Sequence, residues 1–152
     1  MSELESLDPD KLHRMMGELE KAVVILSEEE DYTTAKEHLL SLIKRARMQV
    51  YDTLDLDGSY TLFSTVLALN ATGFLYLAQA GESAGTDKEK DYLIRASGVF
   101  EMINAVFDPI MSKDKDLPTD VREGLDKVSD LASDVAAQLL RKHGVWVDMD
   151  FV

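Results

Sequence analysis

The chain has no cysteine and few of the residues that interrupt helices. Eight of its 152 residues are glycine and three are proline. The absence of cysteine excludes a disulfide framework, a thiol nucleophile and a thiolate metal site. Scarce glycine and proline, together with abundant Leu, Ala, Glu, Asp and Lys, favour helices over a turn-rich β fold.

Recognisable cofactor motifs are missing as well. Neither G-x-G-x-x-G nor G-K-[ST], the loops that cradle phosphates, occurs in the chain. The Glu-x-x-His pattern of di-iron helical bundles is absent at each of the three histidines, His13, His38 and His143. We therefore expect a protein that is not an enzyme and holds no cofactor.

Positive charge is also in short supply. The chain has 29 acidic residues against 16 basic ones, and its formal net charge is −13. A field of this sign repels phosphate backbones, so we expect no nucleic-acid partner. The N-terminal stretch carries acids where a secretory signal needs a positive segment, which predicts a cytoplasmic protein. We expect residues 1–7 to be flexible.

Apolar residues recur at helical spacing in the first third of the chain. Asp8-Pro9 is a typical helix start, and the acidic run 28–31 suits the N-terminus of the next helix. A second helix is predicted from about Thr33 to Leu54. The two predicted buried stripes are Leu12, Met15/Met16, Leu19, Val23 and Leu26, followed by Ala35, Leu39, Ile43 with Leu42, Ala46, Val50 and Leu54.

Gly58–Gly81 contains no charged side chain, so it reads as either a core helix or a membrane span. Its weakly polar residues gather on one narrow edge of a helical wheel: Thr61, Thr65, Thr72 and Gln79, with Ala68 beside them. Burying the amides of Asn70 and Gln79 in lipid without partners would cost roughly 1–3 kcal/mol each. The flanks are acidic and give no Lys/Arg asymmetry. These features predict a buried core helix and no membrane partner.

Two further helices and a tail complete the pattern. Thr86 and Glu89 have the capping-box spacing, and Asp108-Pro109 should end the helix that they begin. Pro118 opens the last helix, and His143-Gly144 closes it. Its predicted buried stripe is Val121, Leu125, Val128, Ala132, Val135 and Leu139, widened by Leu131, Ala136 and Leu140. Residues 145–152, VWVDMDFV, alternate in polarity and predict a short extended tail.

The sequence thus predicts an all-α fold: one domain over 1–152, an antiparallel bundle of about five helices with 58–81 as the buried central helix. The leading hypothesis for function is a protein–protein interaction or scaffold module that self-associates. Its candidate partner-binding residues lie in the tail, because Trp, Phe and Met are enriched at interfaces: Val145, Trp146, Val147, Met149 and Phe151.

Two alternatives remain open. One is a small-ligand or metal-binding bundle, with Asn70, Tyr60 and Tyr76 as candidate pocket residues. Asp126, Asp130 and Asp134, spaced four apart, are candidate metal ligands, although a solvated helix face explains the same spacing. The other alternative, suggested by the charge alone, is an acidic mimic of nucleic acid that binds a basic protein.

Overall fold

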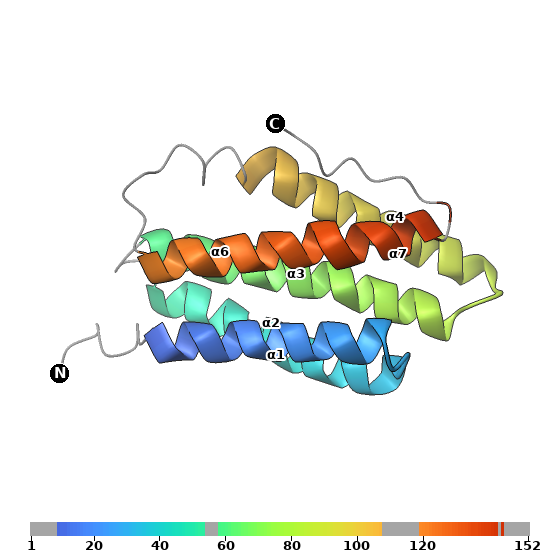
Figure 1. Cartoon of the computed structure of the whole chain (residues 1–152), viewed down its shortest axis with the longest axis horizontal. Coiled ribbons are helices and arrows are strands. Elements are labelled where there is room, and N and C mark those ends of the chain that lie inside the picture. The colour runs from blue at the N-terminus through green and yellow to red at the C-terminus, as the bar shows by residue number, and fades with distance from the viewer. Residues whose placement is uncertain (1–8, 54–57, 108–118, 143, 145–152) are drawn as a thin grey trace.

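The computed structural model describes residues 9–53, 58–107, 119–142 and 144, and nearly all of these residues are helical (Figure 1). The predictions for residues 1–7 and 145–152 lie outside the described residues. Within the described part, five helices pack against one another, which confirms the all-helical fold. In chain order the elements are α1 (Pro9–Ser27), α2 (Tyr32–Thr53), α3 (Gly58–Glu82), α4 (Asp87–Met102) with the π-helical turn η2 (Ile103–Phe107), and α6 (Thr119–Leu131), which continues through the π-helical turn η3 (Ala132–Ala136) into α7 (Ala137–Lys142).

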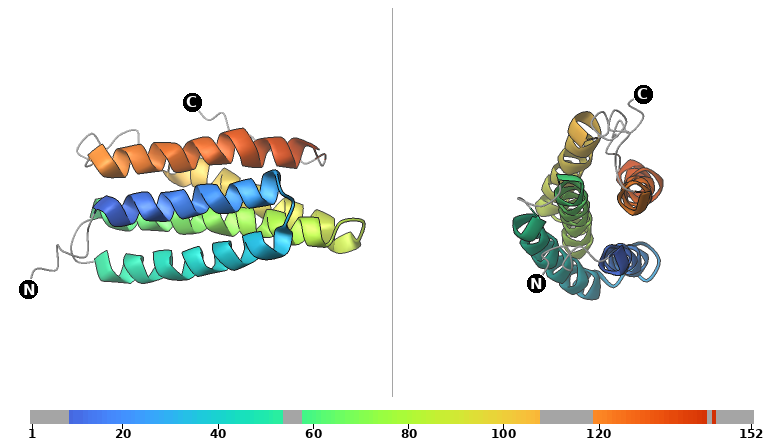
Figure 2. Two further views of the ribbon diagram at one scale, coloured as in Figure 1. Left: turned by 60° about the horizontal axis from the view of Figure 1, so that its bottom comes forward. Right: turned by 90° about the vertical axis from the view of Figure 1, so that its left-hand side faces the viewer.

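The helices are arranged in two layers. The end-on view in Figure 2 shows α2, α3 and α4 in one row, and α1 with the α6–α7 rod in the other. Helix α3 is in the middle of the first row. It packs against α2 and α4 at its sides and against α1 and α6 on its inner side. The predicted central helix therefore contacts α1, α2, α4 and α6.

Helix α3 nevertheless has two distinct sides. Its inner side is fully buried and includes Phe63, Leu67 and Phe74. Its outer side spans an arc of roughly 140° at ~100° per residue. The residues of this outer strip are all partly exposed and uncharged: Thr61, Leu62, Thr65, Ala68, Leu69, Thr72, Leu75, Tyr76 and Gln79. The predicted threonine edge is thus the side of α3 that the described helices cover least.

Three glycines of the described helices allow close packing: Gly73 and Gly81 of α3 and Gly124 of α6. A Cβ atom at Gly81 would overlap the Tyr32 ring of α2. A Cβ atom at Gly73 would lie 2.5 Å from Cζ of Phe100 on α4, and one at Gly124 would lie 2.6 Å from Cε1 of Phe63. Gly17 and Gly98 have no described atom within 4 Å of an added Cβ. Packing therefore requires glycine at 73, 81 and 124 but not at 17 and 98.

The capping residues at the helix N-termini agree only in part with those predicted from the sequence. Helix α1 begins at Pro9, as expected. Asp31 caps α2, because its Oδ1 accepts the Thr34 N–H at 3.2 Å and its Oδ2 accepts the Thr34 hydroxyl at 2.7 Å. The predicted capping box at Thr86 and Glu89 is wrong. The Thr86 hydroxyl donates to the Ser83 carbonyl, and Glu89 accepts the Gly85 N–H, since the tight turn brings these backbone groups closer.

The Asp31 cap predicts a pH-dependent stability. Hydrogen bonds from Thr34 hold the pKa of the Asp31 carboxyl below its ordinary value of 3.8. A lowered folded-state pKa contributes stability above the unfolded pKa, and this stability is lost as pH falls through the folded value. Asp31→Asn keeps the acceptor oxygen without the charge. The melting-temperature difference between the two proteins should be constant well above pH 3.8 and should shrink in more acidic solution. A difference that does not change with pH would contradict this assignment.

The predicted stripe of α2 is partly wrong. Ala35, Leu39 and Ala46 are buried as expected, whereas Ile43 and Val50 are partly exposed. Gln49 takes a buried place instead, at 3% exposure. Its Nε2 donates to Ser64 Oγ of α3 at 2.7 Å, so a polar pair joins the two helices where an apolar pattern indicated none.

The last helix also departs from its predicted stripe. Val121, Leu125, Val128 and Ala132 are buried, as expected. Beyond them Ala136 and Leu140, which the sequence placed at the margin of the stripe, are buried, whereas Val135 and Leu139 are only partly covered. The reason is η3, where the Ala137 N–H donates to the Ala132 carbonyl, five residues back. The wider turn moves every later side chain round the helix by about one position.

Candidate functional site

The outer strip of α3 borders a shallow groove against α2. This α2–α3 groove has a volume of about 310 Å³. Leu69 and Ala68 line it from α3, and Tyr51 stands at its edge with 66% of its surface exposed. The full lining is Ile43, Arg47, Val50, Tyr51, Thr65, Ala68, Leu69 and Thr72.

The groove presents apolar surface because its hydroxyls are already satisfied. Thr65 donates to the Thr61 carbonyl and Thr72 to the Ala68 carbonyl, each at 2.8 Å. On α2, Leu40, Arg47 and Tyr51 follow one another at spacings of seven and four, so they share one side of that helix. Leu40 is 53% exposed. An apolar floor thus continues onto an exposed apolar rim, with Arg47 as the charged group of the lining.

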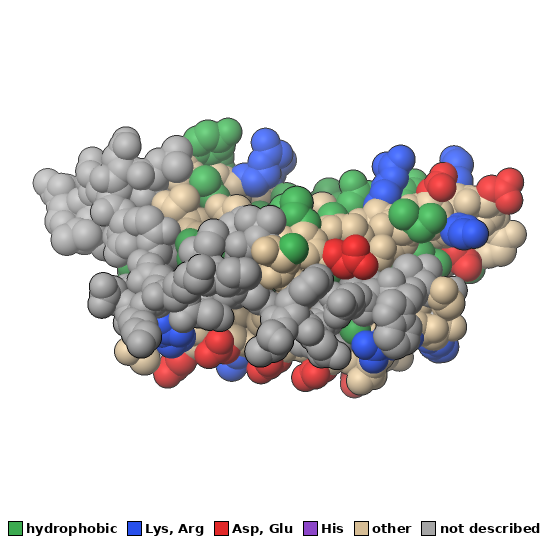
Figure 3. Space-filling view, turned by 90° about the horizontal axis from the view of Figure 1, so that it is seen from above, with side chains coloured by type: hydrophobic (Ala, Val, Ile, Leu, Met, Phe, Trp, Pro, Cys, Tyr) green, Lys and Arg blue, Asp and Glu red, His purple; other side chains and the backbone are tan. Residues whose placement is uncertain are grey.

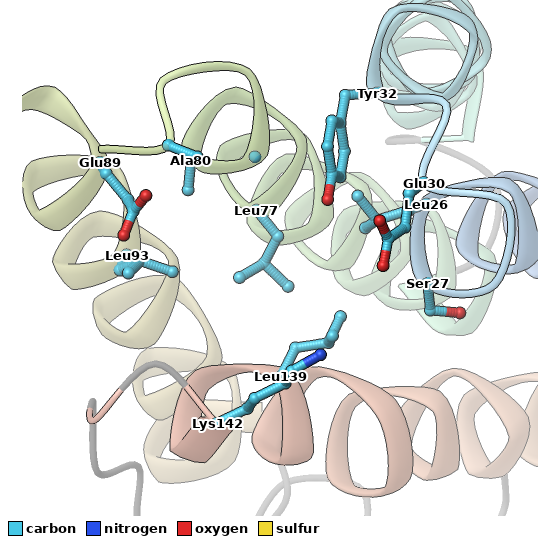
Figure 4. A pocket seen from close by; sticks show the side chains of 12 residues that line it. Leu26, Ser27, Glu30, Tyr32, Leu77, Ala80, Glu89, Leu93, Leu139 and Lys142 are labelled. Carbon is cyan, nitrogen blue, oxygen red and sulfur yellow. The ribbon is translucent and has the colours of Figure 1, made fainter. Parts of the chain in front are cut away.

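A second hollow lies at the end of the bundle that holds the α1–α2 and α3–α4 turns. This end cleft has a volume of about 200 Å³. Figure 4 shows the side chains that line it, which come from α1, α2, α3, α4 and α7 and from the adjoining turns. Its apolar floor is made by Leu26, Leu77, Ala80, Leu93 and Leu139, and its polar edge by Ser27, Glu30, Tyr32, Glu89 and Lys142.

Charge at the end cleft is mixed. Figure 4 shows the Tyr32 hydroxyl and the Glu30 carboxylate turned toward the hollow, with Lys142 on the opposite side. Burial raises the pKa of the Tyr32 phenol, and the negative Glu30 beside it adds to the rise. Tyr32 is therefore protonated at neutral pH and acts as a neutral hydroxyl in the cleft.

The three candidate pocket residues lie on different sides of α3. The Tyr60 hydroxyl donates to Asp120 Oδ2 at 3.3 Å, and the Tyr76 ring stacks on Tyr92 with centroids 6.4 Å apart. Asn70 is fully buried, and its Nδ2 donates to the Val66 carbonyl at 3.0 Å. The structure does not bring the three together, and none lines the two hollows described above.

The acidic ladder on the last helix points to solvent. Asp126, Asp130 and Asp134 are all exposed. Within the described ranges, no group of three or more His, Asp or Glu side chains is placed to hold a metal ion. The ladder therefore matches the solvated helix face.

Three basic residues lie close together in the sequence of α2: Lys44, Arg45 and Arg47. The structure places the two arginines on different sides of the helix. Arg45 Nη1 lies 2.7 Å from Glu18 of α1, and Arg47 borders the α2–α3 groove. Exposed pairs such as Arg45–Glu18 contribute only about 0–1 kcal/mol. Arg45 and Arg47 thus do not contribute to one anion site.

Sequence reasoning missed one pattern in the α3–α4 turn. Gly81–Gly85, GESAG, has the G-x-S-x-G spacing of the α/β-hydrolase nucleophile turn, which requires a strand before it. Here a helix precedes it, and the Ser83 N–H donates to the carbonyls of Gln79 and Ala80. The spacing therefore marks the end of a helix and carries no catalytic assignment.

Two other groups of predictions concern the surface. The candidate partner-binding residues Val145, Trp146, Val147, Met149 and Phe151 lie outside the described residues. By length and composition alone, Tyr60–Glu82 of α3 could cross a membrane. In the structure, 56% of the most apolar stretch of this segment is buried inside the bundle. This burial is typical of a core helix.

Charges are mixed on the face that Figure 3 shows. Acidic and basic side chains alternate at the end of the molecule that holds the α3–α4 turn. Negative charge in this region is interrupted by lysine and arginine. The described part of this face therefore offers no continuous acidic track of the kind that a nucleic-acid mimic requires.

Comparisons with known proteins add nothing to this geometry. No family model, curated protein or solved structure matches the chain. Any functional assignment must therefore come from the molecule's own surfaces.

Proposed function

We propose that this chain is a non-enzymatic helical interaction module of the cytoplasm that self-associates through the α2–α3 groove and the outer strip of α3. The observation that supports it is an uncharged strip on the least covered side of the central helix. Thr61 to Gln79 extends for about 27 Å at ~1.5 Å per residue. The partly exposed leucines of the strip lie beside the exposed Leu40 and Tyr51 of α2, and contiguous apolar surface marks interaction sites on soluble proteins.

Charge favours this side of the molecule for contact with a second copy. Two chains of net charge −13 repel one another over most approaches. The outer strip carries no acid, and the groove lining adds Arg47 as its charged residue. Repulsion is therefore weakest where these surfaces face each other. Nucleic acid and membrane are not among the proposed partners.

The two long edges of the outer strip differ in how much apolar surface they leave available for a partner. Near α4, Tyr76 is held by its stacking on Tyr92. Near α2, Leu40 and Tyr51 remain more than half exposed. The energetically important contacts of the proposed interface should accordingly lie on the α2 side, where apolar surface is still available for burial.

Replacing Leu69 by glutamate should weaken self-association. The change places an acid on the partly exposed floor of the groove in both copies, where it meets desolvation and like charge. We expect the dissociation constant to rise at least about tenfold, a loss of ~1.4 kcal/mol. Sedimentation equilibrium over a range of concentrations measures this dissociation constant.

Added salt should strengthen the self-association of the parent chain, because it screens the repulsion between two negatively charged copies.

Ile94→Glu is the matched control. Ile94 is 51% exposed on α4 and lies outside the groove and the strip, so the same acid there should leave association unchanged. A parent chain that stays monomeric at every concentration would refute the proposal. Equal effects of the two variants would place the contact elsewhere.

A further inference from the structure

The end cleft lies beside the point where the described part of the chain ends. Helix α7 ends at Lys142, and the N–H of Gly144 donates to the Arg141 carbonyl at 3.0 Å. Gly144 has a φ of +80°, the left-handed conformation that closes a helix and redirects the chain. Leu139 and Lys142, in the last turn of α7, themselves line the cleft. The segment 145–152 therefore begins at the rim of this hollow.

The polarity of the segment fits the cleft. Val147, Met149 and Phe151 alternate with Asp148 and Asp150. In an extended chain, alternate side chains point to opposite sides. One side can therefore enter the apolar floor while both aspartates stay in solvent. This orientation is required, because Glu30 and Glu89 are already at the polar edge.

Length also permits the contact. Eight residues reach at most about 26 Å at ~3.3 Å per residue. The floor of the cleft is formed by the ends of α1 and α3 and the start of α4, which lie beside the end of α7 (Figure 4). A segment tethered at the rim has a high effective concentration there, so it competes favourably with a free partner.

We propose that residues 145–152 occupy the end cleft of their own chain, with Val147, Met149 and Phe151 against its apolar floor. The segment would then pack against both the end of α7 and the α3–α4 turn. It is separate from the α2–α3 groove, which lies on the outer side of the first layer. Self-association through the groove and docking of the segment can therefore succeed or fail independently.

Engineered disulfides test the docking directly, because the chain has no cysteine of its own. Ala84 is exposed and lines the cleft, so Ala84→Cys can be combined in turn with cysteine at each position from 147 to 151. Docking predicts that cysteines at 147, 149 and 151 form intramolecular disulfides several-fold faster than those at 148 and 150. Ser41→Cys, on an exposed part of α2, replaces Ala84→Cys as the control and should form none of them.

Each other outcome contradicts the docking. Equal rates along 147–151 would show a segment that samples the cleft without a fixed orientation. Disulfides between two chains alone would place it on a second copy. A chain that ends at Gly144 supplies an independent measurement, since loss of the apolar contacts should lower its Tm by about 2–8 °C. An unchanged Tm would also overturn the proposal.

Discussion

Replacing Gly73 by alanine should lower the free energy of unfolding by about 1–3 kcal/mol, the usual cost of overpacking a core. The new Cβ would lie 2.5 Å from Cζ and 2.8 Å from Cε2 of Phe100. That ring is fully buried and packs edge to face on Phe74, with centroids 5.3 Å apart. Because Phe100 has no free space to move into, α3 and α4 must separate. Chemical denaturation followed by circular dichroism measures the change.

Gly98→Ala is the control for this prediction, and its effect should have the opposite sign. Gly98 is also inside α4, but no described atom lies within 4 Å of an added Cβ there. Alanine should therefore stabilise the protein by about 0.5–1 kcal/mol through its better helix propensity. If Gly73→Ala is as stabilising as Gly98→Ala, the close approach of α3 and α4 at Phe100 is wrong.

Replacing Asn70 by leucine should raise the free energy of unfolding by about 1–3 kcal/mol. Asn70 is fully buried, and no described residue donates a hydrogen bond to its Oδ1. Its Nδ2 bonds the Val66 carbonyl, which lies one turn earlier and so also accepts the backbone N–H of residue 70 in the helix. Leucine of similar size thus removes an unpaired oxygen and leaves that carbonyl satisfied. Thermal and chemical denaturation measure the gain.

Asn70→Asp tests the same buried position by adding a charge there instead of removing a polar group. A carboxylate at this position would be buried without a partner, so we expect a large loss of stability at neutral pH that lessens in acid as the group is protonated. If leucine instead destabilises the protein, the Asn70 oxygen has a structural or ligand-binding role. That result would revive the hypothesis of a pocket between the helices.

Local sequence features predicted the individual helices well. The spacing of Leu12, Leu19 and Val23 placed α1 correctly, because one buried side of a helix repeats every three to four residues. The predicted range Gly58–Gly81 differs from α3 by one residue at its C-terminal end. The threonine edge of that helix was also correctly recognised as its less apolar side. The position of a helix and the side that it buries follow from the spacing of residues within that helix, so they can be predicted from one sequence.

The candidate site depended on information that is not local. A wheel of α3 shows a weakly polar edge but not whether another helix covers it. In the structure, α1 and α6 both pack on the inner side, which leaves the strip around Ala68 and Leu69 open. The end cleft likewise joins Leu26, Leu93 and Leu139, residues from three helices far apart in the chain. No spacing rule relates such positions.

The sequence by itself determined an acidic, cysteine-free, all-helical chain with a charge-free central segment, because composition and periodicity decide those properties. Only the tertiary structure decided which side of that segment is exposed. It also decided that Gln49 is buried through its bond to Ser64, and that the π-helical turn at Ala132–Ala136 shifts the last buried stripe. Each of these depends on a neighbour that another part of the chain supplies. Burial, unlike helix formation, is a property of the whole packed molecule.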